Sequence, residues 1–132
     1  MAISFPSQSL WLFQGDSITD AGRHRGDDRC LGQGYAARVA DRMRQLRPDA
    51  GLRFLNRGCS GHRACDLVAR WSEDCLDWQP AVVSLLIGIN DTWRRYDRQD
   101  PTAVEHFAAQ VDHLLGQVRR HTSAQLVVLE PF

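Results

Sequence analysis

The sequence predicts an α/β domain in which a parallel β-sheet carries helices on both faces. Two observations support this prediction: short apolar runs alternate with longer segments of helical periodicity, and their order along the chain is βαβαβαβ. We find no internal repeat, low-complexity tract or linker, so residues 1–132 are expected to form a single domain. The hydrophobic fraction of 43% is ordinary for a globular domain with a modest core.

The expected strands are short apolar runs that end at turn or breaker residues. They cover residues 10–14, 52–56, 81–87 and 126–129, and the third is nearly all apolar, as is typical of a strand covered on both faces. With right-handed crossovers these strands fit a flavodoxin-like, doubly wound order of 2-1-3-4-5. In that order ligands bind at the carboxyl ends of the strands, near the junction of strands 1 and 3.

Three helices are expected between the strands, over residues 35–47, 64–78 and 104–118. Pro48 and Pro80 end the first two. Apolar residues recur at helical spacing in each and predict the core-facing stripes. The stripes are Tyr35, Val39, Met43 and Leu46; Ala64, Leu67, Val68, Trp71, Cys75 and Trp78; and Val104, Phe107, Ala108, Val111, Leu114, Leu115 and Val118. The polar residues 20–33 are expected to form a solvated surface loop.

Composition excludes several classes of function. The 16 basic residues, all arginine, balance 16 acidic ones, and zero net charge gives no electrostatic reason to expect nucleic acid. Without lysine the chain has no Schiff-base or P-loop lysine. The four cysteines show no CxxC spacing, so neither a metal nor a cofactor is expected. No apolar run approaches the roughly 20 residues of a membrane span, and no secretory signal is evident. We therefore expect a cytoplasmic protein with no membrane partner.

Residues that could take part in catalysis gather in glycine-rich loops after the first three strands. These loops are Gly-Asp-Ser-Ile-Thr at 15–19, Asn-Arg-Gly-Cys-Ser-Gly at 56–61 and Gly-Ile-Asn-Asp at 88–91. In the order 2-1-3 the three strand ends are neighbours, so the loops should meet in one crevice. Each loop taken alone is typical of a simple turn, with the aspartate acting as a cap. Their occurrence together, in order, favours a functional site.

The arrangement predicts nucleophilic catalysis by a serine. Ser17 leaves a central strand on a tight turn, where a nucleophile would be exposed. The backbone N–H groups of Ser17 and Gly61 and the side-chain amide of Asn90 could donate to a developing oxyanion. The supporting residues of these motifs are Gly15, Asp16, Gly88 and Asp91.

The three loops resemble the first blocks of the SGNH (GDSL) hydrolases. Longer segments, FQGDSITDAGR, LGQGYAARVA, LNRGCSGHRACDL, RWSEDCLDWQP and SLLIGINDTWRRYD, are similar to the intracellular acetylxylan esterase branch of that family. The resemblance implies a three-layer αβα fold and a serine esterase with Ser17 as nucleophile and Ser17, Gly61 and Asn90 as the oxyanion hole. One departure is His62, where relatives often carry asparagine; it would alter the crevice wall or simply face solvent.

The resemblance also implies a fourth block, Asp-x-x-His, which supplies the general base, and these 132 residues contain no such block. The chain is therefore expected to resemble the N-terminal two-thirds of a hydrolase, lacking the last strand and helix. Only His24 and His62 could reach Ser17 as substitutes. On its own the chain should have little turnover, and the apolar strand at 126–129 should be an edge that self-associates or is covered by a missing segment or a second subunit.

The expected partner is a small acyl ester, most simply an acetylated sugar such as a xylo-oligosaccharide, hydrolysed through an acyl-enzyme. Trp93 and Tyr96 could stack on a sugar ring, although core or subunit packing would explain them equally well. Two alternatives stay open. One is a carboxylesterase, thioesterase or lysophospholipase of broad specificity; the other is a binding module that has lost its base. A homo-oligomer is compatible with each.

Overall fold

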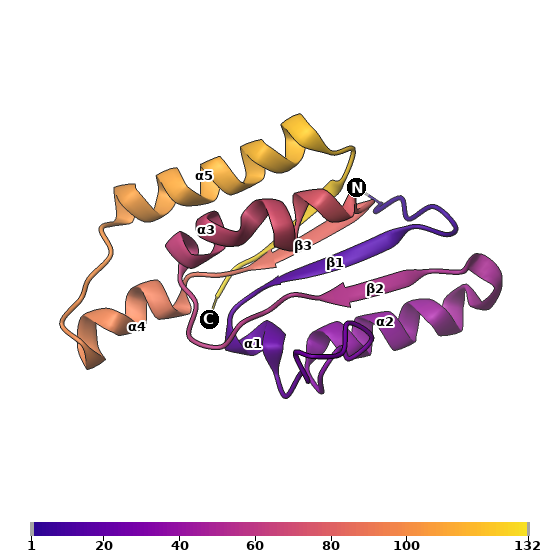
Figure 1. Ribbon diagram of the computed structural model, residues 1–132, viewed down its shortest axis with the longest axis horizontal. Coiled ribbons are helices and arrows are strands. Elements are labelled where there is room, and N and C mark those ends of the chain that lie inside the picture. The colour runs from indigo at the N-terminus through magenta and orange to yellow at the C-terminus, as the bar shows by residue number, and fades with distance from the viewer. Residues whose placement is uncertain (1, 132) are drawn as a thin grey trace.

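Four strands form one parallel sheet in the order β2-β1-β3-β4 in the computed structural model, which describes residues 2–131 (Figure 1). The strands are β1 (Leu10–Gly15), β2 (Arg53–Asn56), β3 (Val82–Leu86) and β4 (Gln125–Leu129). The register sets Phe13 beside Asn56 and Gly15 beside Leu86. The predicted doubly wound parallel sheet is thus confirmed, with its first four strands in the expected order.

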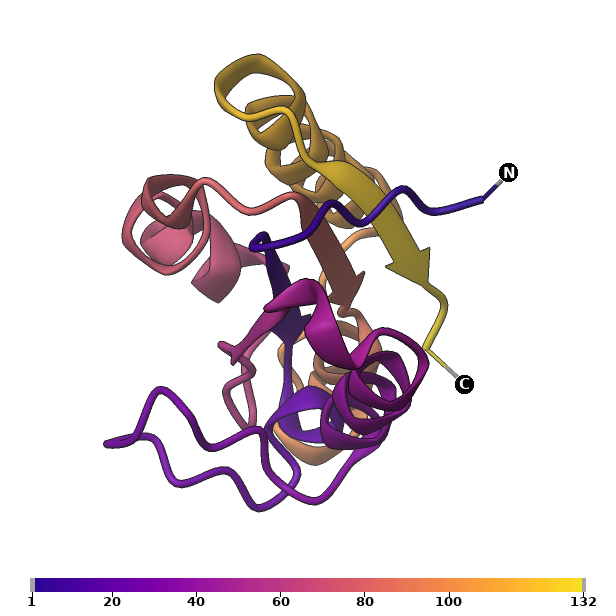
Figure 2. The same cartoon turned by 90° about the vertical axis from the view of Figure 1, so that its right-hand side faces the viewer.

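Helices cover the sheet on both faces. Figure 2 shows α2 (Tyr35–Leu46) on one side and α3 (Ala64–Asp74) with α5 (Val104–His121) on the other. Two further helices, α1 (Ser17–Asp20) and α4 (Ile89–Asp97), lie at the carboxyl ends of the strands (Figure 1). Short 3₁₀ turns, η1 (Pro48–Ala50) and η2 (Leu76–Trp78), follow α2 and α3. This arrangement is the three-layer αβα architecture that the sequence predicts.

The two faces of the sheet have different cores. An aromatic cluster fills the α2 face, where the rings of Trp11 and Phe13 stack at 5.6 Å between centroids. The α2 helix approaches closely because it turns Ala36 and Ala40, both fully buried, toward this cluster. The opposite face is mainly aliphatic; its fully buried residues include Leu12, Leu67, Leu85, Leu114 and Val118. The central strands are thus buried on both faces, and the motif loops extend from their carboxyl ends.

Several details of the helices differ from the sequence predictions, including the unpredicted short helix α1 and the end of α5 at His121. The helix predicted at 64–78 ends at Asp74, because the backbone turns at Cys75 and continues as η2. This break buries Cys75 and Leu76 together and lets Trp78 lie under the Arg57 guanidinium. The α4 helix was not predicted, because its sequence is mostly polar and only Ile89, Trp93 and Tyr96 recur at helical spacing. Finally, three residues assigned to the core stripes are exposed: Leu46, Val104 and Ala108.

The β4 strand has β3 as its neighbour and forms one edge of the sheet. Its residues are only partly buried, and Val128 is 52% exposed. At its start, the Gln125 side chain exchanges hydrogen bonds with the main chain of Ser4. Self-association through this apolar edge stays a prediction. Within residues 2–131, no helix combines the length and apolarity needed to cross a membrane.

Candidate active site

Ser17 stands at the point where β1 turns into α1, with its side chain exposed above buried neighbours. The turn is sharp because Gly15 has no side chain. A Cβ on Gly15 would lie 2.3 Å from both the Leu86 carbonyl oxygen and the Thr19 hydroxyl oxygen, which no real Cβ tolerates. Glycine at position 15 therefore brings the first turn of α1 directly against β3 and presents Ser17 to solvent.

Asp16, the residue before Ser17, is fully buried and caps α1. Its Oδ1 accepts a hydrogen bond from the Ile18 backbone N–H at 3.0 Å. Burial raises the pKa of the Asp16 carboxyl, although the hydrogen bond from Ile18 opposes this shift. Asp16 thus acts as the N-cap of α1, as it would in a simple turn. This cap orients the first turn of the helix, which includes Ser17.

Asn56, at the end of β2, joins three separate loops. Its amide Nδ2 donates to the carbonyls of Thr19 (2.6 Å) and Leu31 (2.9 Å), and its Oδ1 accepts from the Gly58 N–H (2.9 Å). Asn56 is 1% exposed, so these three bonds satisfy an amide that would be costly to bury unpaired. The sequence placed Asn56 in the site loops but gave it no role; the structure makes it the link between α1, the surface loop and the second motif.

Gly58 packs directly on the backbone of α1. A Cβ at this position would lie 2.5 Å from the Asp20 nitrogen and 2.8 Å from the Thr19 carbonyl carbon. We expect Gly58→Ala to lower the free energy of unfolding by roughly 1–3 kcal/mol, because the loop and α1 must separate. Urea denaturation measures this. Gly26→Ala is the matched control, since its Cβ would meet the His24 ring at an ordinary 3.5 Å. Equal midpoints for the two variants would contradict the prediction.

The second and third motifs are connected by a hydrogen bond between Asn90 and His62, the residue after Gly61. Gly61 is exposed and has a φ of +83°, a conformation that favours glycine. The Asn90 amide, at the start of α4, donates to the carbonyl of His62, the next residue after Gly61, at 3.0 Å. An amide has two N–H groups, so Asn90 retains a second donor. The three predicted loops are therefore joined at one end of the sheet.

Gly88 and Asp91 lie beside a cavity of about 280 Å³ at the carboxyl ends of β3 and β4. Asp91 Oδ2 accepts from the N–H of Ala64 at 3.1 Å and so ties α4 to the start of α3. Burial raises the pKa of the Asp91 carboxyl, against the lowering effect of that hydrogen bond. The cavity is also lined by Thr92, Arg95, Tyr96, Thr102 and Phe107.

Trp93 and Tyr96 are 56% and 72% exposed on α4. This exposure is inconsistent with packing in the core of the domain, which was one of the three interpretations open from sequence. Tyr96 lines the cavity next to Asp91, and both aromatic residues stand on the helix that carries Asn90. They are available to a ligand or to another subunit.

His62 is held in a form that cannot take a proton from Ser17. The Arg70 Nε–H donates to Nδ1 of His62 at 3.2 Å, so the neutral ring carries its proton on Nε2. Burial, together with the positive charge of Arg70, lowers the pKa of His62 and keeps the ring neutral. His24 is exposed in the surface loop, where its ring lies against Gly26. The structure gives neither residue the contacts of a general base.

Arg70 is a residue that the sequence analysis missed. Besides His62, its guanidinium bonds Gln14 Oε1 at 3.1 Å, the Arg57 carbonyl at 3.0 Å and the Asp74 carboxylate at 2.9 Å. A usable signal was Gln14 itself, a polar residue within the apolar run 10–14 that is fully buried in the structure. Within residues 2–131, histidine, cysteine and carboxylate side chains form no cluster of three or more suited to a metal.

Comparison with known proteins identifies the family. Residues 13–132 match the model of the GDSL-like lipase/acylhydrolase family. The chain belongs to this family. The match covers the three motifs described above and confirms the resemblance seen in the sequence.

Individual relatives of this GDSL-family chain are acetylxylan esterases and a lipase candidate. An acetylxylan esterase from Geobacillus stearothermophilus is 49% identical over 90 residues, which are 65% of this chain and 41% of the relative. A crystal structure of an acetylxylan esterase from that organism superposes with a TM-score of 0.89 and 36% identity, over 100% of this chain and 63% of the other. The crystal structure of a GDSL-like lipase candidate from Parabacteroides merdae superposes with a TM-score of 0.94 and 36% identity, over 98% of this chain and 62% of the other. The chain thus spans less than two thirds of these relatives.

Proposed function

We propose that this chain provides the serine nucleophile and the oxyanion hole of a carboxylic-ester hydrolase. The single observation that carries the proposal is the exposed Ser17 on a glycine-dependent turn that is tied to the other two loops. Asn56 bonds α1 to the loop that bears Gly61, and His62 bonds that loop to Asn90. In the proposed reaction, Ser17 Oγ attacks the acyl carbon while its proton passes to a general base. The carbonyl oxygen, now negative, accepts hydrogen bonds from the N–H groups of Ser17 and Gly61 and from the Asn90 amide.

The tetrahedral intermediate then collapses, and the alcohol leaves with the proton that the base returns. Water attacks the acyl-Ser17 ester in the same way, releasing the acid and restoring the hydroxyl. The family supplies the base from an Asp-x-x-His block that these 132 residues do not contain. Some Geobacillus acetylxylan esterase structures are described as catalytic mutants with a serine, an aspartate or a histidine replaced by alanine. In those relatives, the replaced aspartate and histidine stand three positions apart, as in an Asp-x-x-His block.

For the substrate we propose short acyl esters, most simply acetyl esters of xylo-oligosaccharides. The names of the Geobacillus relatives support this choice. The exposed Trp93 and Tyr96, on the helix that carries Asn90, offer aromatic faces to a sugar ring. We also predict that the protein is cytoplasmic and forms a homo-oligomer.

The proposal is tested by assaying the full-length gene product on phenyl acetate, butyrate and octanoate and on an acetylated xylo-oligosaccharide. We expect the highest kcat/KM with acetyl esters. Trp93→Ala should raise KM for the sugar ester severalfold while leaving phenyl acetate unaffected, since only the sugar reaches the aromatic face. A maximum at octanoate would favour an esterase or lysophospholipase of broad specificity. No hydrolysis of any ester would favour a binding module.

A further inference from the structure

Asp20, the last residue of α1, contacts the loop that bears Gly61. Its side chain is only 6% exposed, and one carboxylate oxygen, Oδ2, accepts from both the backbone N–H (2.9 Å) and the hydroxyl (3.1 Å) of Ser60. Asp20 follows Ser17 by three residues, and Ser60 immediately precedes Gly61. One carboxylate therefore joins the helix of the proposed nucleophile to the residue next to a proposed oxyanion donor.

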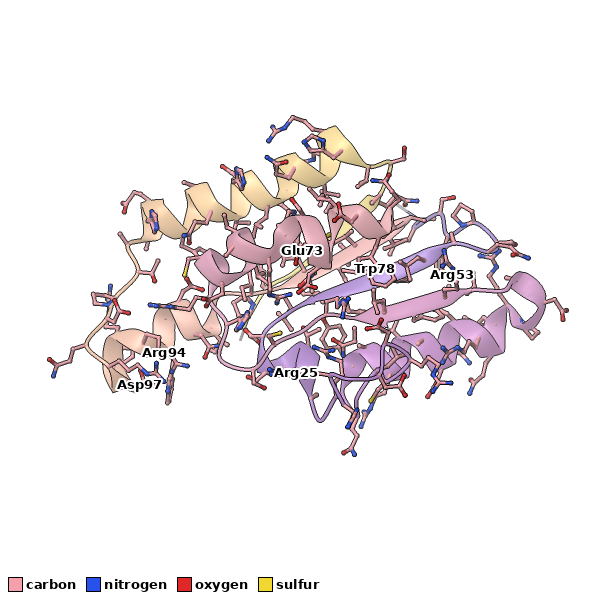
Figure 3. The ribbon with its side chains drawn as sticks, viewed as in Figure 1. Arg25, Arg53, Glu73, Trp78, Arg94 and Asp97 are labelled. Carbon is pink, nitrogen blue, oxygen red and sulfur yellow. The ribbon has the colours of Figure 1, made fainter. Side chains whose placement is uncertain are left out.

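Two arginines hold this carboxylate in place. Arg25, labelled beside α1 in Figure 3, donates to Oδ2, and Arg23 Nε lies 3.5 Å from Oδ1. Arg23 also donates to the carbonyl of Gly58 at 2.6 Å, within the same loop. Burial alone would raise the pKa of Asp20, but the hydrogen bonds from Arg25 and Ser60 outweigh it and lower the pKa. The Asp20 carboxylate is thus charged at neutral pH, and both of its oxygens can accept hydrogen bonds.

Gly61 lies between two anchored residues. On one side, Ser60 is bound to Asp20. On the other, the His62 N–H donates to the Cys59 carbonyl at 3.2 Å, and the His62 carbonyl accepts from Asn90. Gly61 itself has a positive φ and no side chain to fix it. The direction of its N–H therefore depends on these neighbours.

We propose that Asp20 is a positioning residue, whose contact with Ser60 holds the Gly61 N–H at the distance from Ser17 that an oxyanion requires. This inference rests on the proposed function. A displacement of about 1 Å in such a donor can cost about 10²-fold in rate. Asp20 touches no reacting atom, so its effect is expected in kcat rather than in KM.

The test compares Asp20→Ala, Asp20→Asn and Ser60→Ala in the full-length gene product. The asparagine keeps one acceptor oxygen for the Ser60 N–H, and Ser60→Ala loses only the hydroxyl bond. We expect kcat per phosphonate-titrated Ser17 to fall about 10–100-fold in Asp20→Ala, less in Asp20→Asn and least in Ser60→Ala, with KM nearly constant. Titration counts only sites with a working nucleophile. Should the alanine variant not fold, Asp20→Asn carries the test.

The matched control is Asp27→Asn. Asp27 also accepts hydrogen bonds from a backbone N–H and from a guanidinium N–H, both of Arg29, but it lies in the exposed part of the loop. It should behave as wild type. Hydrogen exchange of the 58–62 segment, measured on the same proteins, should accelerate most in Asp20→Ala, less in Asp20→Asn, and not at all in Asp27→Asn.

Two results would overturn the inference while leaving the proposed function intact. One is faster exchange with unchanged kcat per titrated site, which would make Asp20 purely structural. The other is unchanged exchange and unchanged kcat. An inactive wild-type protein would instead overturn the proposed function, and this inference with it.

Discussion

Ser17→Ala should lower kcat for ester hydrolysis by the full-length gene product about 10⁴–10⁶-fold, the loss typical of a deleted serine nucleophile. The physical reason is that no acyl-enzyme can form without the hydroxyl. Because Ser17 is exposed and the cap bond uses Asp16 and the Ile18 N–H, the alanine variant should fold and melt like wild type. Steady-state assays with acetyl esters, together with thermal melts, measure both expectations.

Ser72→Ala is the matched control, because Ser72 is also exposed but lies on α3. Mass spectrometry after treatment with a serine-reactive phosphonate gives an independent readout. Wild type and Ser72→Ala should carry one adduct on Ser17, and Ser17→Ala should carry none. Equal hydrolysis by wild type and Ser17→Ala would refute the assignment of the nucleophile. Absence of the adduct in wild type would favour a binding module.

Asn90→Ala should lower kcat about 10²–10³-fold, the usual cost of losing one oxyanion donor. Asn90 is 8% exposed and spends one amide hydrogen on the His62 carbonyl, so the second is free for the substrate oxygen. KM should change little, because the donor acts mainly on the charge that develops in the transition state. Kinetics on acetyl esters separate the two constants.

Gln79→Ala serves as the control for Asn90→Ala. Gln79 is likewise an amide that donates to main-chain carbonyls, those of Leu76 and His121, but it lies at the opposite end of β3. Its replacement should leave kcat unchanged. A similar loss in both variants would mean that Asn90 acts through general stability, and a rise in KM alone would assign it to substrate binding.

Local sequence determined the layered fold, because apolar periodicity reports burial residue by residue. The apolar runs near Leu10 and Val82 became central strands, and the stripe around Leu114 and Val118 faces the sheet as predicted. The same logic failed for α4, whose residues Ile89–Asp97 are mostly polar, and for the end of α3 at Asp74. The bounds of these helices depend on tertiary packing, which local periodicity does not report.

The sequence names candidate site residues but not the hydrogen bonds that connect them. Ser17, Gly61 and Asn90 could be named from loop position alone, since parallel strands bring their carboxyl ends together. The contacts of Asp20 with Ser60 and of Arg70 with His62 join residues far apart in the chain, and no local pattern encodes them. Only the tertiary structure could decide that the unprotonated nitrogen of His62, Nδ1, accepts a hydrogen bond from Arg70. Hydrogen-bond partners are set by three-dimensional proximity, whereas strands and helices are set by neighbours along the chain.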